Sequence, residues 1–432
     1  MRRPRRAIEA RHPRMASAIW GWRLELALGL AVWVLLDLGQ LFGDGGELLV
    51  IGLVAIAWWA MPQMRRKVLR QLIDARDRRR LTSAMWRCLV VGRDGTAPRI
   101  VSSQNLESGR SFVVRLPPGL HVEALEAMVP EIAAAVGAMT VRCRVVPRSA
   151  SFAELVVVTR DVLACPVVGS PLLDAERTSL WDAIPLGMDE DGAPAFLGLP
   201  EHNLLIGGEP GSGKSVALSS IVAAAALDPD ATLTLLDGKQ VELAVWRSAA
   251  NRFVGPDLAD AVDVLEALRE TMDERFGYLV ETGLRKIVRE DDLGLHLVVI
   301  DELALYLRGG ARTLHEQFAE ALRDLVSRGR AAGFIIVVAT QKPSHEVVPT
   351  WIRDLFSYRI ALRCTSKEAS DTILGQGWAA CGFSASSINP DHRGVAYLLA
   401  EGGVPHRIRI THLTDIDLAV LAHRAEMLRG GL

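Results

Sequence analysis

The stretch Gly208-Glu209-Pro210-Gly211-Ser212-Gly213-Lys214-Ser215 decides the fold of this 432-residue chain. A short apolar run, Leu204-Leu205-Ile206, comes before it, and an apolar segment with helical character follows. The pattern G-x-x-x-x-G-K-[ST] in this strand–loop–helix context predicts a phosphate-binding loop. Its glycines let backbone N–H groups wrap around phosphates, and the N-terminus of the next helix favours an anion.

Two side chains of this stretch have predicted roles toward a bound nucleotide. Lys214 is expected to reach the β- and γ-phosphates of ATP, and the hydroxyl of Ser215 is expected to hold Mg²⁺. ATP and Mg²⁺ are therefore the expected cofactors. The residues predicted to bind the nucleotide are those of the whole loop: Gly208, Glu209, Pro210, Gly211, Ser212, Gly213, Lys214 and Ser215.

Polar residues close two further apolar runs. Asp301 and Glu302 follow the run 297–300, and Gln341 follows the run 334–339 after one threonine. Asp301 suits Mg²⁺, Glu302 suits the base that orients the attacking water, and Gln341 suits a sensor of the γ-phosphate or of that water. The predicted catalytic set is Lys214, Asp301, Glu302 and Gln341, with Ser215 and Asp301 as metal ligands. An aspartate that caps a helix after a buried strand is the structural alternative for Asp301.

The spacing of these runs predicts the fold class. A fourth β-rich run, 232–236, ends at Asp237, and helical patterns separate the four runs. This alternation predicts an α/β fold with a mostly parallel sheet and ligands at the carboxyl ends of its strands. The adjacent Asp-Glu pair and the sensor strand favour, by analogy, a RecA-like phosphate-loop ATPase over a kinase or a GTPase.

Composition and charge indicate a folded chain with a basic end. Half of the residues are hydrophobic and 23% are charged, which excludes a wholly disordered protein. Residues 1–80 carry a net charge of +8, whereas the remainder carries −10. This asymmetry favours tethering at an anionic surface over a protein that coats nucleic acid. The five cysteines are scattered without metal-ligand spacing and are interpreted as reduced intracellular thiols.

The basic end contains two apolar runs that predict a transmembrane helical hairpin. They span about 24–42 and 46–61, with an acidic turn between them and arginine-rich flanks on both sides. Because positive flanks stay in the cytoplasm, both ends of the hairpin are expected there. Four tryptophans at the outer ends match an interfacial belt: Trp20, Trp22, Trp58 and Trp59. The expected location is thus the inner (cytoplasmic) membrane, multi-pass, with the ATPase domain in the cytoplasm. The second run is short, which leaves a re-entrant or soluble helical pair as the alternative.

The chain between the hairpin and the phosphate loop predicts a scaffold domain. Residues 81–165 contain β-rich runs around a helical pattern at 121–137, with no residue that indicates catalysis. The predicted domains are therefore 1–80 for the basic N-terminus and hairpin, 81–165 for a small α/β domain, and 166–432 for the ATPase.

Several ordered motifs resemble the FtsK/SpoIIIE family of DNA translocases. Asp237-Gly238-Lys239-Gln240-Val241-Glu242-Leu243 is similar to the family's Asp-Pro-Lys-x-x-Glu-Leu signature. Three further segments resemble the sensor region, the segment after it and the start of the small domain: Arg330-Ala331-Ala332-Gly333 with Val338-Ala339-Thr340-Gln341, then Arg359-Ile360-Ala361-Leu362-Arg363-Cys364, and Leu116-Pro117-Pro118-Gly119. The resemblance covers about residues 84–415.

The resemblance implies a homo-hexameric ring that threads double-stranded DNA and a trans arginine supplied by the neighbouring subunit. Arg330, Arg359 and Arg363 are the candidates, and the sequence does not choose among them. Gly238 and Asp371 depart from the family, which has Pro at the first position and, in many members, Arg at the second.

A loop in the pore is also implied by the resemblance. The basic, glycine-rich segment 306–312 follows the Asp-Glu pair, and Arg308 and Arg312 are the candidates for contacts with the DNA backbone. A solvated surface loop is the alternative for this segment.

These observations lead to one function and three rivals. The expected function is a membrane-anchored, ATP-driven double-stranded DNA translocase. Its compact, single-motor layout resembles actinobacterial conjugative-element proteins that transfer a plasmid or integrative element. The rivals are a type VII-like protein-secretion ATPase, a chromosome-segregation DNA pump, and a non-motor anchor at the membrane. Envelope or septal partners are not identified by the sequence.

Overall fold

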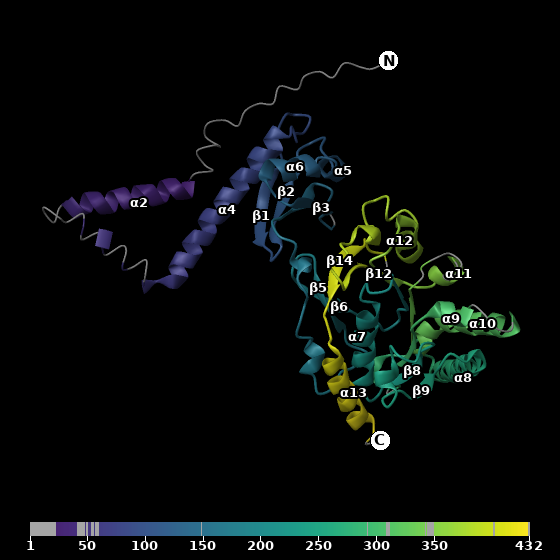
Figure 1. Cartoon of the computed structure of the whole chain (residues 1–432). Helices are drawn as coiled ribbons and strands as arrows, with labels where there is room; N and C mark the ends of the chain where they lie inside the picture. Colours follow the sequence, from purple (N-terminus) through teal and green to yellow (C-terminus); the bar gives the residue numbers. More distant parts are fainter. Residues whose placement is uncertain are drawn as a thin grey trace, which may run out of the picture. The chain divides into compact units, whose positions relative to one another are not determined.

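The computed structural model describes residues 23–40, 48, 51–52, 56, 60–147, 149–291, 293–307, 312–341, 343, 350–400 and 402–430. The chain divides into two compact units, Met1–Asp161 and Val162–Leu432. Figure 1 labels many of the helices and strands of both units.

The first unit is built on a four-stranded antiparallel sheet with strand order β1-β2-β4-β3. Its elements are α2 (Arg23–Gln40), α4 (Pro62–Arg87), β1 (Arg99–Asn105), β2 (Gly109–Arg115), α5 (Val122–Glu126), α6 (Val129–Val136), β3 (Thr140–Val145) and β4 (Phe152–Val158). Leu81 and Met85 of α4 pack with Phe112 and Leu155 of the sheet in one core. The single helical pattern at 121–137 is two helices, because Pro130 has no N–H with which to continue the first one.

Among the described residues, no helix is both long enough and apolar enough to cross a membrane. The first run predicted to span corresponds to α2, whose 18 residues include Arg23, Glu25 and Asp37. Most of the second predicted run, 46–61, lies outside the described residues. The structure therefore does not show the predicted transmembrane hairpin.

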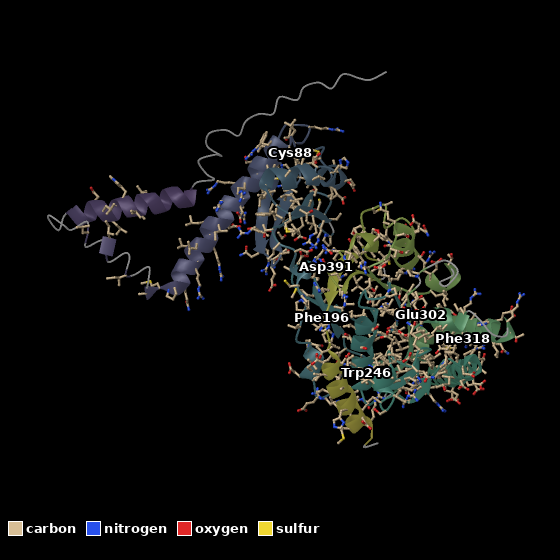
Figure 2. The ribbon with its side chains drawn as sticks, in the orientation of Figure 1. Cys88, Phe196, Trp246, Glu302, Phe318 and Asp391 are labelled. Atoms are coloured by element: carbon tan, nitrogen blue, oxygen red, sulfur yellow. The ribbon has the colours of Figure 1, made fainter. Side chains whose placement is uncertain are left out.

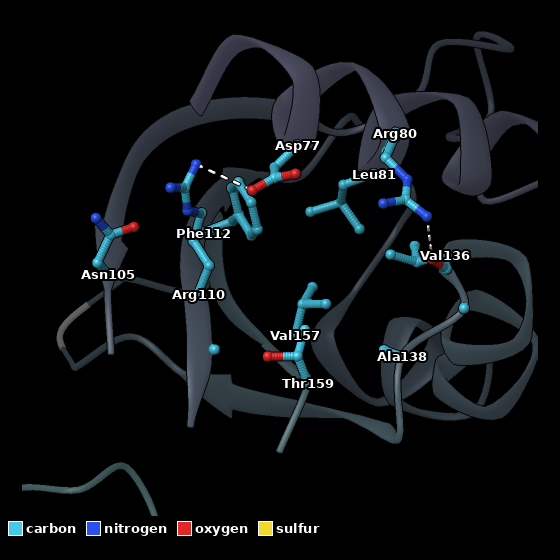
Figure 3. Close-up of a pocket in the computed structure, with 12 residues that line it drawn as sticks. Asp77, Arg80, Leu81, Asn105, Arg110, Phe112, Val136, Ala138, Val157 and Thr159 are labelled. Carbon is cyan, nitrogen blue, oxygen red and sulfur yellow. Dashed lines mark hydrogen bonds and ion pairs between the residues drawn. The ribbon is translucent and has the colours of Figure 1, made fainter. Parts of the chain in front are cut away.

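A pocket of about 200 Å³ lies between α4 and the sheet of the first unit (Figure 3). Its two arginines already have partners, because Arg110 pairs with Asp77 and Arg80 donates to the carbonyl of Val136. The rest of the lining is largely apolar and includes Phe112. Both arginines of the pocket are thus already engaged within the first unit.

The second unit is built on a ten-stranded sheet with the order β6-β5-β14-β13-β12-β7-β11-β10-β8-β9. Its strands are β5 (Ile184–Asp189), β6 (Pro194–Leu197), β7 (Leu204–Gly207), β8 (Thr232–Leu236), β9 (Arg252–Val254), β10 (His296–Ile300), β11 (Phe334–Thr340), β12 (Tyr358–Leu362), β13 (Val395–Leu399) and β14 (His406–Ile410). The six strands from β12 to β9 run parallel, and the other four join them as an antiparallel extension. The predicted α/β class with a mostly parallel sheet is confirmed.

Helices cover both faces of this sheet (Figure 1). They are α7 (Lys214–Ala226), α8 (Leu258–Thr282), α9 (Leu303–Leu307), α10 (Arg312–Arg328), α11 (Thr350–Arg353), α12 (Lys367–Leu374) and α13 (Asp415–Arg429). Short 3₁₀ turns complete the unit: η1 (Val162–Ala164), η2 (Pro171–Leu173), η3 (Ala244–Trp246), η4 (Arg289–Asp291), η5 (Gly329–Ala332) and η6 (Ala385–Ser387).

The two faces of the sheet form separate apolar cores. The core with α7 and α13 contains Trp246, whereas the core with α8, α9 and α10 contains Phe318; Figure 2 labels both side chains. Successive strand residues alternate between these cores, as Leu205 and Ile206 of β7 do. Both faces of the central strands are therefore buried, which explains why their sequences are uninterrupted apolar runs.

Candidate ATP site

The predicted site residues meet at one edge of the ten-stranded sheet. Strands β7, β11, β10 and β8 are parallel neighbours, so the segments that follow them lie side by side. The phosphate loop follows β7, Asp301 follows β10, Gln341 follows β11, and Asp237 follows β8. This is the edge where open α/β sheets bind ligands.

The phosphate loop needs glycine at Gly211 and Gly213 because both have positive φ, +77° and +108°. Gly213 is also crowded, since an added Cβ would lie 2.9 Å from the Cα of Gly394. The N–H of Gly394 donates to the carbonyl of Ser212 at 2.9 Å. The segment before β13 thus packs against the phosphate loop and supports it. No motif in the sequence predicts this contact.

Lys214 and Asp301 form a buried pair in the centre of the site. Lys214 Nζ lies 2.5 Å from Asp301 Oδ1 and 2.8 Å from the Asp301 carbonyl oxygen. Only 3% of the lysine side chain and none of the aspartate side chain are exposed. The pair therefore fixes the position of the lysine ammonium group and the orientation of the carboxylate.

The donors present fit a magnesium ion. Asp301 Oδ2 is buried and has no hydrogen-bond partner among the described residues, which leaves it available as a ligand. Ser215, in the first turn of α7, offers a hydroxyl. Mg²⁺ prefers a few protein oxygens and takes its other ligands from phosphates and water. Across the described part of the chain, no group of three or more His, Cys, Asp or Glu side chains could hold a metal by itself.

Glu302 is held in one orientation by the end of β11. Its Oε1 accepts a hydrogen bond from Thr340 Oγ1 and its Oε2 accepts one from the backbone N–H of Gln341, both at 2.9 Å. The residue as a whole is only 6% exposed. Gln341, predicted as a sensor, thus contacts the predicted base through its backbone.

Lys239 is a site residue that the motif analysis did not single out. Its Nζ lies 4.0 Å from Glu302 Oε2. The buried carboxylate of Asp237 shapes the turn that carries it, by accepting from the backbone N–H groups of Lys239, Gln240 and Leu243 at 3.1, 2.9 and 2.9 Å. At Gly238, where the family has Pro, an added Cβ would lie 2.6 Å from Leu305 Cδ1, the end of an exposed side chain.

The three candidates for the trans arginine all contact groups of their own chain. Arg330 Nε donates to the carbonyl of Glu201 at 2.5 Å. Arg359 Nε donates to the carbonyl of Phe356. Arg363 pairs with Glu209 of the phosphate loop.

Arg359 has the contacts of a structural residue. It donates to the carbonyls of Phe356, Leu374 and Arg353 at 3.0, 3.0 and 3.3 Å. Burial, with a smaller contribution from Arg353, lowers the pKa of this guanidinium. Its side chain therefore joins the ends of β12, α11 and α12.

Replacing Arg359 with alanine is expected to destabilise the second unit by about 1–3 kcal/mol, because carbonyls lose their donor. Denaturant unfolding of the full chain measures this change. We expect ATP turnover per folded molecule to fall far less than it would on loss of a trans arginine. Normal stability combined with a turnover loss of about 10³-fold would instead assign Arg359 that trans role.

The two DNA-binding candidates differ in what the structure describes. Arg312 begins α10, is 92% exposed and pairs with Glu316 at 2.8 Å. The pKa of its guanidinium is raised by the hydrogen bond from this arginine to Glu316. Arg308 lies outside the described residues. Arg312 therefore has the exposure that a DNA contact requires, with one competing carboxylate.

Four features define the class of protein: a buried strand, a glycine-rich loop, a lysine at the start of a helix, and an Asp-Glu pair at the end of a neighbouring strand. The second unit is a phosphate-loop ATPase domain with a RecA-like sheet.

Comparison with known proteins shows which family this domain resembles. Residues 173–377 match the model of the FtsK/SpoIIIE family. DNA translocase FtsK of Staphylococcus epidermidis is 28% identical over 62% of this chain and 36% of its own length, and FtsK of Agrobacterium fabrum is 28% identical over 60% and 34%. The ATPase domain of this chain is therefore similar to the motor domains of the FtsK/SpoIIIE family. The chain spans about a third of the length of these relatives.

Two solved structures share the fold. The pCW3 conjugation coupling protein TcpA, solved as a monomer with ATPγS, has a TM-score of 0.53 and 17% identity over 82% of this chain and 99% of its own. EssC (ATPases 2 and 3) from Geobacillus thermodenitrificans has a TM-score of 0.51 and 17% identity over 62% and 52%. At these identities the likeness concerns the fold alone.

Proposed function

We propose that this chain is an ATP-driven translocase of double-stranded DNA, anchored at the cytoplasmic membrane and acting in conjugative transfer. One observation carries the proposal: a domain that matches the FtsK/SpoIIIE family model has an intact phosphate loop beside the predicted base, Glu302, which is held by Thr340 and Gln341. A conjugation coupling protein has the same fold over most of the chain, which is compatible with conjugation.

The site residues divide the work of hydrolysis. Lys214 and the loop N–H groups hold the phosphates, while Ser215 and Asp301 Oδ2 would hold Mg²⁺, which neutralises charge on the phosphates when bound. Glu302 takes a proton from the attacking water, since its two hydrogen bonds leave oxygen lone pairs free. A homo-hexameric ring with a trans arginine would complete the site.

Membrane anchoring rests on the sequence of the N-terminal region. The basic flanks continue into α4, where Arg66, Lys67 and Arg70 are exposed. These charges suit the anionic cytoplasmic face of a bilayer. A chromosome-segregation pump would have the same membrane anchor and the same ATPase domain. The proposed translocase would act on plasmid DNA and on chromosomal DNA alike.

ATP hydrolysis by the detergent-purified full chain is expected to accelerate when linear duplex DNA is added. The stimulation should fall between about 50 and about 200 mM salt, because phosphate contacts release counterions. Arg312→Ala should weaken this effect through the loss of one phosphate contact.

Arg285→Ala, at another exposed arginine of the same unit, is the matched control and should retain full stimulation. ATP hydrolysis that is robust and equally fast with and without DNA would contradict the translocase proposal and favour a secretion ATPase. Binding of ATP without turnover, with or without DNA, would favour the non-motor anchor.

A further inference from the structure

Arg363 and Glu209 connect strand β12 to the phosphate loop at two points. Arg363 Nη1 lies 2.5 Å from Glu209 Oε1, and the two side chains are only 28% and 17% exposed. The backbone N–H of Glu209 also donates to the carbonyl of Arg363 at 2.9 Å. The loop is thus linked to the end of a neighbouring strand by an ion pair and by a backbone hydrogen bond.

The carboxylate of Glu209 poses an electrostatic problem for the loop. It is the second residue of a segment that binds a polyphosphate anion, and like charges repel most strongly where water is partly excluded. Glu209 is mostly buried, so salt screens it poorly. A loop with this residue needs a compensating cation nearby, and Arg363 is that cation.

The surroundings of the pair indicate a fixed arrangement. Cys364, next in sequence, is buried, and burial together with the charge of Glu209 raises the pKa of its thiol to about 12. Gly208, on the other side of Glu209, has no room for a side chain, because a Cβ would lie 2.7 Å from Leu362 Cβ. Gly208, which precedes Glu209, and Cys364, which follows Arg363, are therefore both tightly packed.

We propose that Arg363 is a positioning residue that acts in cis: it neutralises Glu209 and fixes the phosphate loop, and thereby sets the affinity for ATP. This inference rests on the proposed ATP-binding function of the site. It assigns Arg363 a role in its own subunit and removes it from the candidates for the trans arginine.

The two roles of Arg363 predict different kinetics. A trans arginine stabilises the transition state, so its loss lowers kcat and is indifferent to Glu209. A cis partner of Glu209 changes nucleotide binding, so its loss raises KM more than it lowers kcat. Removal of the Glu209 charge should then compensate for it.

The test uses the full chain in four forms: wild type, Glu209→Gln, Arg363→Ala and the double variant. Titration with ATPγS is expected to give about tenfold weaker binding for Arg363→Ala, because an uncompensated carboxylate faces the phosphates. The double variant should return to within about threefold of wild type. Glu209→Gln alone should bind at least as tightly as wild type, which keeps the test decisive where Arg363→Ala fails to fold.

Arg177→Ala is the matched control, since Arg177 forms an exposed pair with Asp230 at 3.3 Å in the same unit, and it should leave binding unchanged. Equal weakening in Arg363→Ala and the double variant, or clearly weaker binding in Glu209→Gln, would overturn the inference. A wild-type chain that does not bind ATPγS would instead contradict the proposed function.

Discussion

Lys214→Ala is expected to reduce ATP hydrolysis by at least about 100-fold, because the lysine is the side chain of the loop that is predicted to reach the β- and γ-phosphates. A second effect follows from its contacts. Lys214 Nζ is the partner of the fully buried Asp301 carboxylate at 2.5 Å. Loss of one partner of a buried pair leaves an uncompensated charge, which costs about 3–5 kcal/mol of stability.

The double variant Lys214→Ala/Asp301→Asn separates these two effects. Neutralising residue 301 should recover most of the stability in denaturant unfolding, whereas hydrolysis should stay absent. Steady-state phosphate release and unfolding of the same preparations provide both readouts. Turnover near the wild-type rate in folded Lys214→Ala would show that the loop is not the hydrolytic site.

Glu302→Gln is expected to slow hydrolysis by about 10²–10⁴-fold while ATP still binds, since an amide cannot accept the proton of the attacking water. The substitution preserves the local structure. Its carbonyl oxygen can still accept from the Gln341 N–H, and the Thr340 hydroxyl can turn to accept from the new amide group. Single-turnover hydrolysis and equilibrium ATP binding should therefore separate in this variant.

Thr340→Val provides the matched control for Glu302. It removes one of the two hydrogen bonds to the carboxylate and keeps the other, so a smaller loss of rate is expected than for Glu302→Gln. An equal loss in both variants would mean that Glu302 acts through its position and not as the base. A Glu302→Gln chain with normal turnover would exclude Glu302 from the chemistry.

The sequence predicts the parallel half of the fold well. The four apolar runs appear as β7, β8, β10 and β11, because strands buried on both faces need uninterrupted apolar residues. The antiparallel extension was not predicted from the sequence. Its strands pair segments far apart in the chain, as Ile408 of β14 does with Asp189 of β5, and no local pattern reports such a register.

The candidate site likewise combines local motifs that the sequence predicts with long-range contacts that it does not. The phosphate loop and the Asp-Glu pair are local motifs, so the residues that meet at the sheet edge were predictable. The contacts of Arg363 with Glu209 and of Lys239 with Glu302 join separate segments, and only the fold brings them together. The break at Pro130 was not predicted, although proline is a local signal for it. The spanning hairpin predicted from apolar runs is not shown by the described residues.

The pairing of β5 with β14 constrains how this protein can be made. Strands β5 and β6 leave the ribosome before the phosphate loop, yet their partner β14 emerges more than two hundred residues later. Until then the nascent chain carries a hairpin whose sheet edge is unpaired, which invites aggregation and slows folding. Chaperones that shield strand edges should therefore matter more for production of this ATPase than for one whose sheet is assembled in chain order.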